Sequence, residues 1–343
     1  MAKLTAIDLF CGAGGMSAGL KQAGFRVLAA IDVDPIAIES FEANHRGSQV
    51  MLCDIRSAKA AGLQRSLALR PGDLDLLAGC PPCQSFSTLK TLNGRRRVRD
   101  KGNKDLLFEM IKFVRVFEPK AIMLENVPRL AEDHRIQILA KRLRELGYVS
   151  RWKVLNAADY GVPQRRKRMI LIAAKLKFGV PSFAAPWRPG RTVLDAIGSL
   201  PAPAESKDPL HAVPELRSHK IRKLISRIPK DGGSRGALPK SDQLVCHQKV
   251  DGFKDVYGRM AWDKVAPTIT SGCFNPSKGR FLHPEANRCI SLREAALLQG
   301  FPSNYRFALR HGKVSVARLI GNALPPPFIR RHSLSIRALI SEH

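Results

Sequence analysis

The sequence predicts a doubly wound α/β fold with a largely parallel sheet, joined to a smaller, loop-rich domain. Short apolar runs alternate with amphipathic stretches through the first half of the 343 residues, as strands and helices do in such a sheet. A glycine-rich stretch, CGAGG, follows the first apolar run directly, where a strand-to-helix turn is expected. From Phe183 to about Pro284 the chain is rich in Pro, Gly, Ser and basic residues and has weak periodicity. We therefore expect one domain over residues 1–185 together with 285–343, and a second over 186–284.

Seven short apolar runs predict the strands of the sheet. They are residues 4–10, 27–32, 49–52, 74–78, 121–125, 149–155 and 169–174. One helix is expected after the glycine turn and one at Pro35, which suits the first turn of a helix. Helical spacing predicts the others over 104–117, 138–146, 291–299, 314–320 and 327–340. Ser291 and Glu294 have the spacing of a capping box at the start of one of these helices.

Positive charge is the strongest signal in the composition. Lysine and arginine number 57 against 29 acidic residues, which gives a formal net charge of +28. Such an excess points to a polyanion, above all nucleic acid, although a generally basic protein is the alternative. The basic residues are clustered at 95–99, 165–168 and 217–230, which favours a phosphate-binding surface. Because no apolar run is long enough for a signal peptide or a membrane span, we expect a cytoplasmic protein with no membrane partner.

Two of the seven cysteines, Cys80 and Cys83, enclose two prolines just after the fourth predicted strand. A structural zinc site needs four ligands, and no second pair has suitable spacing, so we expect no metal. A thioredoxin-like pair would open an apolar helix, whereas a basic loop follows here. The pattern itself leaves a redox pair, inert buried thiols and a single nucleophilic cysteine as alternatives.

The glycine turn predicts a ligand with a nucleoside. Glycines at 12, 14 and 15 let the backbone approach a ligand closely and leave helix N–H groups free, although a turn without a ligand uses the same residues. Asp32 ends the second strand about 20 residues after Gly12, which is the right place to bind ribose hydroxyls. Asp54 follows the third strand and could reach an adenine amino group. Ligands of open α/β sheets bind at the carboxyl ends of strands, where five candidates fall: Gly12, Asp32, Asp54, Cys83 and Glu125.

Six motifs, in order and over nearly the whole chain, resemble those of the cytosine carbon-5 DNA methyltransferases. They are IDLFCGAGG at 7–15, PCQ at 82–84, ENV at 125–127, QRRKR at 164–168, REA with LQGFP at 293–302, and GNALPP at 321–326. The resemblance implies a Rossmann-like, S-adenosylmethionine-dependent methyltransferase sheet, with residues 186–284 as the target-recognition domain. It also implies methyl transfer to carbon 5 of cytosine in DNA.

The resemblance implies that Cys83 adds as a thiolate to carbon 6 of a cytosine flipped out of a specific double-stranded sequence. Glu125, protonated, would hydrogen-bond ring nitrogen 3, and Arg166 and Arg168 would lie beside the base. A capping or salt-bridging carboxylate and a phosphate-binding arginine patch are the alternatives. Residues 88–103 resemble the loop that closes over the flipped base. Further substrate contacts are expected from Pro82, Gln84, Ser87, Asn126, Gln164, Thr268 and Thr270.

The resemblance also implies the residues that hold S-adenosylmethionine. These are Phe10, Gly12, Ala13, Gly14, Gly15, Asp32, Val33, Asp54, Ile55, Asn322 and Ala323. Three positions depart from the family pattern: Asp32 stands where glutamate is more usual, two prolines precede Cys83, and Cys80 matches no catalytic role.

The partners that the resemblance implies are double-stranded DNA and, unless the enzyme is an orphan, a cognate restriction endonuclease acting on the same site. One active site per chain suits a monomer. A tRNA-modifying variant, a catalytically dead DNA-binding relative and a CxxC oxidoreductase are the competing hypotheses.

Overall fold

The computed structural model describes residues 3–82, 106–187, 190–244, 246 and 255–341. The chain divides into two compact units, the first of residues 1–156, 167–185 and 328–343, and the second of residues 157–166 and 186–327. The expected division into 1–185 with 285–343 and 186–284 stays a prediction. Residues 285–327, expected in the first domain, group with the second unit. The reason is packing between helices, because α9 (Leu292–Leu298) packs against both α10 (Gly312–Asn322) and α6 (Val193–Ile197).

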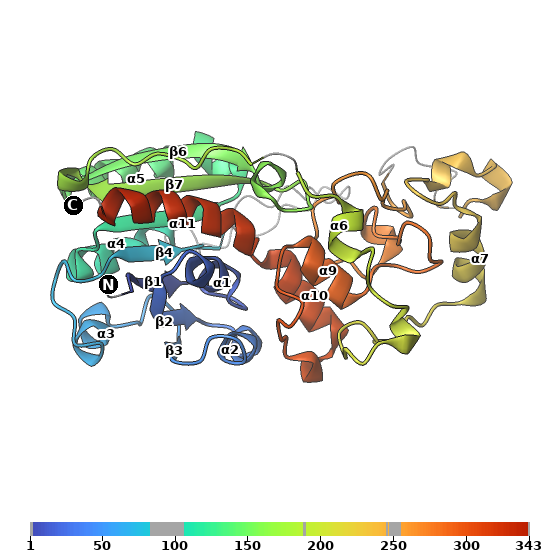
Figure 1. The fold of residues 1–343 in the computed structure, drawn as a ribbon, viewed down its shortest axis with the longest axis horizontal. Coiled ribbons are helices and arrows are strands. Elements are labelled where there is room, and N and C mark those ends of the chain that lie inside the picture. The colour runs from blue at the N-terminus through green and yellow to red at the C-terminus, as the bar shows by residue number, and fades with distance from the viewer. Residues whose placement is uncertain (1–2, 83–105, 188–189, 245, 247–254, 342–343) are drawn as a thin grey trace. The chain divides into compact units, whose positions relative to one another are not determined.

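The first unit is built on a seven-stranded sheet with the order β3-β2-β1-β4-β5-β7-β6 (Figure 1). The strands are β1 (Thr5–Leu9), β2 (Arg26–Asp32), β3 (Gln49–Leu52), β4 (Leu76–Gly79), β5 (Ala121–Asn126), β6 (Tyr148–Asn156) and β7 (Lys167–Lys175). Neighbouring strands from β3 to β5 are parallel, whereas β7 is antiparallel to both β5 and β6. The predicted doubly wound and largely parallel sheet is therefore confirmed.

Among the described residues, six helices have all or most of their length in this unit. They are α1 (Gly15–Gln22), α2 (Pro35–Glu42), α3 (Ala60–Ser66), α4 (Leu106–Phe117), α5 (His134–Glu145) and α11 (Pro326–Ser341). Pro35 occupies the first turn of α2 as expected, and the side chain of Asp34 caps that helix by accepting from the Ile36 N–H. Arg330 and Arg337 of α11 donate to carbonyls at the end of α1, which ties the last helix to the first. No helix within the described residues is long and apolar enough to cross a membrane.

The parallel strands bring their carboxyl ends to one edge of the sheet. All six residues of β5 and all four of β4 are buried, because helices cover the central strands on both faces. A polar residue that ends such a strand therefore lies where the apolar core stops. Asp32 and Glu125 occupy such positions in β2 and β5, and Asp54 comes two residues after β3.

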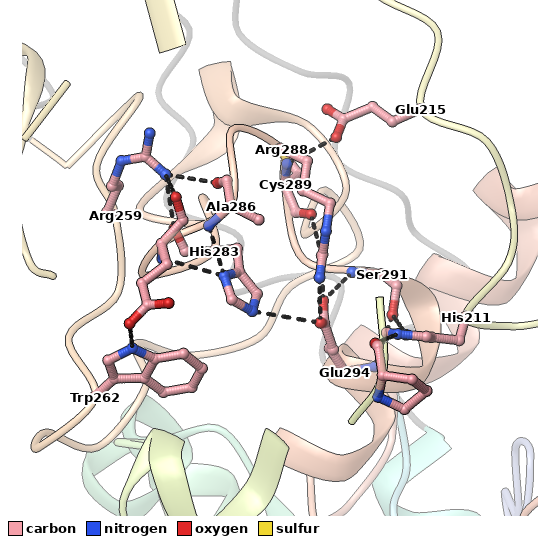
Figure 2. Close-up of polar contacts among 12 residues, drawn as sticks. His211, Glu215, Arg259, Trp262, His283, Ala286, Arg288, Cys289, Ser291 and Glu294 are labelled. Atoms are coloured by element: carbon pink, nitrogen blue, oxygen red, sulfur yellow. Dashed lines mark hydrogen bonds and ion pairs between the residues drawn. The ribbon is translucent and has the colours of Figure 1, made fainter. Parts of the chain in front are cut away.

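The second unit consists of short helices joined by long loops, and its described part contains isolated bridges but no named strand (Figure 1). Its helix α7 (His219–Arg227), which was not expected from the sequence, buries Leu224 and Ile225 and exposes most of its basic residues. Side-chain hydrogen bonds hold the loops of this unit together. The fully buried Arg259 donates to the carbonyls of His283 and Ala286 (Figure 2). It also donates to the carbonyls of Ile225, Ile228 and Glu285 and to the side chain of Asn287.

A second polar cluster in this unit holds the start of α9. The predicted capping box is confirmed, because Ser291 accepts from the Glu294 N–H and Glu294 accepts from the Ser291 N–H. Arg288 pairs with both oxygens of Glu294 at 2.7 Å, and His211 lies 2.7 Å from the Ser291 hydroxyl (Figure 2). These contacts hold the Glu294 carboxylate in its charged form, so the pKa of Glu294 is lowered even though the group is buried.

Candidate active site

The glycine turn after β1 has the strained backbone of a ligand-binding loop. Phe10 has a φ of 62°, a value that side chains rarely adopt, and Gly12 and Gly14 also have positive φ. A Cβ at Gly12 would meet nothing within 4 Å, so space stays open above this turn. Ala13 is buried, and Gly15 opens α1. The turn therefore leaves backbone accessible where a ligand is expected.

Asp32 holds this turn from the neighbouring strand. Its Oδ2 accepts from the Gly12 N–H at 2.8 Å and its Oδ1 from the Asp34 N–H at 2.9 Å. Burial raises the pKa of Asp32, and these backbone N–H groups partly offset the effect. A carboxylate has about four acceptor positions, so further hydrogen bonds from hydroxyl groups can be accepted. Val33, the next residue, is exposed.

The carboxyl group of Asp8 in β1 is buried and is hydrogen-bonded to α1, the helix that follows the glycine turn. Ser17, which interrupts the usual dinucleotide-binding glycine pattern, donates from its hydroxyl to Asp8 Oδ2 at 2.6 Å. Both residues are completely buried. Burial raises the pKa of Asp8 to about 7, against the opposing effect of the Ser17 hydrogen bond. Ser17 thus supports the strand from within the first helix and is not a replacement for a phosphate-binding glycine.

Asp54 already has a partner on its own loop. Arg56 binds its two oxygens through Nε at 3.0 Å and through Nη2 at 2.5 Å. The hydrogen bonds from the Arg56 side chain are the main reason that the pKa of Asp54 falls to about 2. The next residue, Ile55, is buried, and its carbonyl accepts from the Lys112 ammonium of α4. Lys112 therefore holds this loop to α4 through the Ile55 carbonyl.

Several polar side chains meet at the carboxyl ends of β4 and β5. Glu125 is 2% exposed, and its two oxygens have different partners. The Cys80 thiol donates to Oε2 at 2.9 Å, and Arg168 Nε of β7 lies 2.9 Å from Oε1. Beside them, the Asn126 amide donates to the Pro81 carbonyl at 3.0 Å. Three strands thus converge on one carboxylate.

Cys80 was missed as a functional candidate, and the strand register could have identified it. In the parallel pair of β4 and β5, Gly79 is opposite Leu124, so the next residues, Cys80 and Glu125, are opposite one another. Burial and the neighbouring Glu125 carboxylate raise the pKa of the Cys80 thiol well above its usual value. This thiol is therefore a hydrogen-bond donor and is poorly suited to act as a thiolate. Pro82, two residues after Cys80, is exposed.

Several expected site residues lie outside the described part of the chain. These are Cys83, Gln84, Ser87 and the predicted loop of residues 88–103. Within the described residues, no group of three His, Cys, Asp or Glu side chains could hold a metal ion.

The two arginines of the QRRKR motif have different environments. Arg168 forms an ion pair with the Glu125 carboxylate, and its expected place beside the base stays a prediction. Arg166 was also expected there, but it is buried in the second unit and donates to the carbonyls of Ile269 at 3.1 Å and Gly321 at 3.0 Å. Because its terminal nitrogens serve these backbone groups, Arg166 is a structural residue in this conformation.

Gln164 is likewise an anchor of the second unit. It is fully buried, its Oε1 accepts from the Ile269 N–H at 2.8 Å, and its Nε2 donates to the Gln299 side chain. Thr268 and Thr270 on the anchored segment are exposed, and Thr268 donates to the Arg165 carbonyl at 2.6 Å. The anchors leave these two threonines at the surface.

The GNALPP motif begins at the end of α10. Asn322 is the last residue of this helix and is exposed, whereas Ala323 caps the helix through its backbone N–H. The preceding Gly321 is required by packing, since a Cβ there would lie 2.3 Å from the backbone of Thr270 and Ser271.

Comparisons with known proteins agree with this arrangement. The family model of the C-5 cytosine-specific DNA methylases matches residues 4–337. The chain is 39% identical to the Type II methylase M.HgiDII of Herpetosiphon aurantiacus, over 97% of this chain and 95% of the relative. It is 33% identical to the Type II methyltransferase M1.HphI of Haemophilus parahaemolyticus, over 94% of this chain and 84% of the relative.

Solved structures show the same fold. A prophage-encoded E. coli protein described as a DNA modification methyltransferase aligns with a TM-score of 0.75 at 23% identity, over 98% of this chain and 99% of that one. The S. pombe Dnmt2 methyltransferase aligns with a TM-score of 0.62 at 20% identity, over 99% of both chains. The match of the family model over nearly the whole length decides the assignment: this chain belongs to the C-5 cytosine-specific DNA methylases, whose methyl donor is S-adenosylmethionine.

Proposed function

We propose that this enzyme methylates carbon 5 of a cytosine flipped out of a specific double-stranded DNA sequence, through a covalent adduct between Cys83 and carbon 6. The observation that carries the proposal is the Glu125 carboxyl group near the end of β5, which accepts a hydrogen bond from the Cys80 thiol after β4 and forms an ion pair with Arg168 of β7. Cys83 lies three residues beyond Cys80, and Cys80 contacts this carboxyl group. A nucleophile and a carboxyl group on adjoining strand ends suit attack on a pyrimidine ring.

The roles of the residues follow from the chemistry of cytosine. Addition of the Cys83 thiolate to carbon 6 forms an S–C bond and makes carbon 5 electron-rich. A protonated Glu125 would hydrogen-bond ring nitrogen 3 and offset the charge that addition creates. Once carbon 5 has taken the methyl group, loss of its proton to a base and of the Cys83 thiolate from carbon 6 restores the aromatic ring. Arg168 is assigned to contact the base in addition to Glu125. Arg166 is assigned to lie beside the base while it donates to the carbonyls of Ile269 and Gly321.

The turn after β1 fits S-adenosylmethionine, which supplies an electrophilic methyl group when bound. Gly12, Gly14 and Gly15 leave backbone accessible to its amino-acid moiety, with Ala13 between them, and Phe10 covers the adenine. The Asp32 carboxylate keeps acceptor positions for ribose hydroxyls next to Val33. Adenine is assigned to Asp54 and Ile55, which requires Arg56 to give up part of its contact with Asp54. Asn322 and Ala323 complete the methionine end.

Target recognition is assigned to residues 186–284, and catalysis to 1–185 with 285–343. The exposed basic side chains of α7 support binding of DNA phosphates, and Thr268 and Thr270 are exposed for contact with the target nucleotide. Pro82, Gln84, Ser87 and Asn126 are assigned to the flipped base, and residues 88–103 to a closing loop. The enzyme is proposed to act as a cytoplasmic monomer in a restriction-modification pair or as an orphan enzyme.

Bisulfite sequencing of DNA from cells that express the protein tests the activity and reveals the recognised sequence. We expect one short sequence to be methylated at cytosine, and Cys83→Ser to abolish methylation while DNA binding survives. Wild-type enzyme should be trapped on DNA that carries 5-fluorocytosine, since the carbon-5 proton cannot then be removed. Full activity of Cys83→Ser, or methylation of tRNA in place of DNA, would overturn the proposal.

A further inference from the structure

The ends of β4 and β5 are joined by two successive side-chain contacts. Cys80 donates from its thiol to Glu125, and one residue further on Asn126 donates from its amide to the Pro81 carbonyl. The Cys80 N–H also donates to the Leu9 carbonyl at 3.1 Å, which fixes the same segment to β1. Cys80 is therefore held to β5 through its side chain and to β1 through its backbone.

The residue before Cys80 has no room for a side chain. A Cβ at Gly79 would lie 3.2 Å from the Leu9 carbonyl oxygen and 3.2 Å from the sulfur of Met110. Glycine at this position therefore lets the end of β4 lie close to β1 and α4, and Cys80 continues directly from it.

We propose that Cys80 is a positioning residue for the reaction, whose thiol holds one oxygen of Glu125 while Arg168 holds the other. The proposal rests on the proposed role of Glu125 toward the cytosine ring. The hydrogen bond from the thiol and the ion pair with Arg168 come from different strands and together fix the plane of the carboxyl group, so that Glu125 is oriented before the base enters. A raised thiol pKa is consistent with this role, because the sulfur keeps its proton and continues to donate.

A first experiment tests the hydrogen bond independently of activity. The infrared S–H stretching band of Cys80 can be identified as the band that disappears in Cys80→Ala. We expect this band at lower frequency than that of Cys273, a buried thiol identified in the same way with Cys273→Ala. Glu125→Gln should then shift the Cys80 band and leave the Cys273 band in place. A Cys80 band that does not respond to Glu125→Gln would overturn the proposal.

A second experiment tests the consequence for the reaction. Cys80→Ala should lower kcat by about tenfold, the upper end of what a hydrogen bond between uncharged groups contributes. The dissociation constants for DNA and S-adenosylmethionine should not change, because the thiol orients Glu125 and does not bind either molecule. Cys80→Ser restores a donor and should recover kcat to within about twofold of the wild type. Cys273→Ala serves as the matched control and should leave kcat unchanged.

The outcomes separate this inference from the proposed function. An unchanged kcat in Cys80→Ala, or an equal loss in Cys80→Ser and Cys80→Ala, overturns the positioning role while methylation by the wild type stands. If the wild type methylates no cytosine, the proposed function fails, and the infrared comparison still decides whether the thiol holds Glu125. Circular dichroism of each variant identifies a loss that is due to misfolding, in which case Cys80→Ser and the infrared comparison carry the decision.

Discussion

Alanine at Gly321 and alanine at Gly62 should change stability in opposite directions, although both glycines lie in helices. Alanine is favoured over glycine in a helix by about 0.5–1 kcal/mol, so helix propensity alone predicts that both variants are more stable. A Cβ at Gly62 in α3 makes an ordinary contact of 3.6 Å with Lys59. Gly62→Ala should therefore gain roughly the propensity difference.

Gly321 in α10 differs because another backbone crosses it. A Cβ there would lie 2.3 Å from the Thr270 carbonyl carbon and from the Ser271 nitrogen, which cannot move as a flexible side chain does. Overpacking of this kind costs about 1–3 kcal/mol. Displacement of the helix also weakens the hydrogen bond that Arg166 donates to the Gly321 carbonyl. After subtraction of the propensity gain, we expect a net loss of about 2 kcal/mol.

Urea unfolding followed by circular dichroism measures both effects, and the two variants serve as controls for each other. A loss of about 2 kcal/mol lowers the midpoint by roughly 0.5–1 M. Hydrogen exchange should show faster exchange in Gly321→Ala within residues 266–271 and α10, and unchanged exchange in β1 and β5. If Gly321→Ala is as stable as the wild type, the backbone of Thr270 and Ser271 does not lie as close to Gly321 as the structure has it.

Two further variants test buried polar groups. Arg259→Met fills the same space but leaves at least three buried carbonyls without their donor. Urea unfolding should therefore show a loss of stability of about 3–5 kcal/mol. A loss below about 1 kcal/mol would contradict the role given to Arg259. Because the pKa of Asp8 is raised from 3.8 to about 7, the folded protein loses stability as the pH rises from about 4 to about 7, by at most about 4 kcal/mol. Asp8→Asn cannot ionise, so its stability relative to the wild type should increase across that pH range, and a difference that is constant with pH would refute the assignment.

The fold was predictable where the signal is local. Short apolar runs predicted every strand, because the central strands are buried on both faces, and Ser291 with Glu294 predicted a capping box that needs only the spacing of two residues. Three of the described helices were not predicted, because each is short and buries only two residues. These are Ala60 and Leu63 in α3, Val193 and Ile197 in α6, and Leu224 and Ile225 in α7.

The site was predictable as a set of strand ends but not as a set of contacts. Partners of Arg166 lie 103 and 155 residues away along the chain, and no local pattern connects them. The Arg56 side chain at Asp54 and the Cys80 thiol at Glu125 were also not foreseen. The second of these follows from the strand register, which needs the alignment of β4 with β5 and not only their existence.

Arg259 has a consequence for how the sequence of the second unit can change. Nearly all of the hydrogen bonds that its guanidinium donates go to main-chain carbonyls, which every amino acid provides. Side chains at the end of α7 (225–228) and in the loop at 283–286 can therefore change without loss of the donor that joins these two segments. Lysine would keep the charge but not the five N–H donors of the guanidinium, so substitution of Arg259 itself is not tolerated. This part of the second unit can therefore vary in sequence at its surface as long as Arg259 is kept.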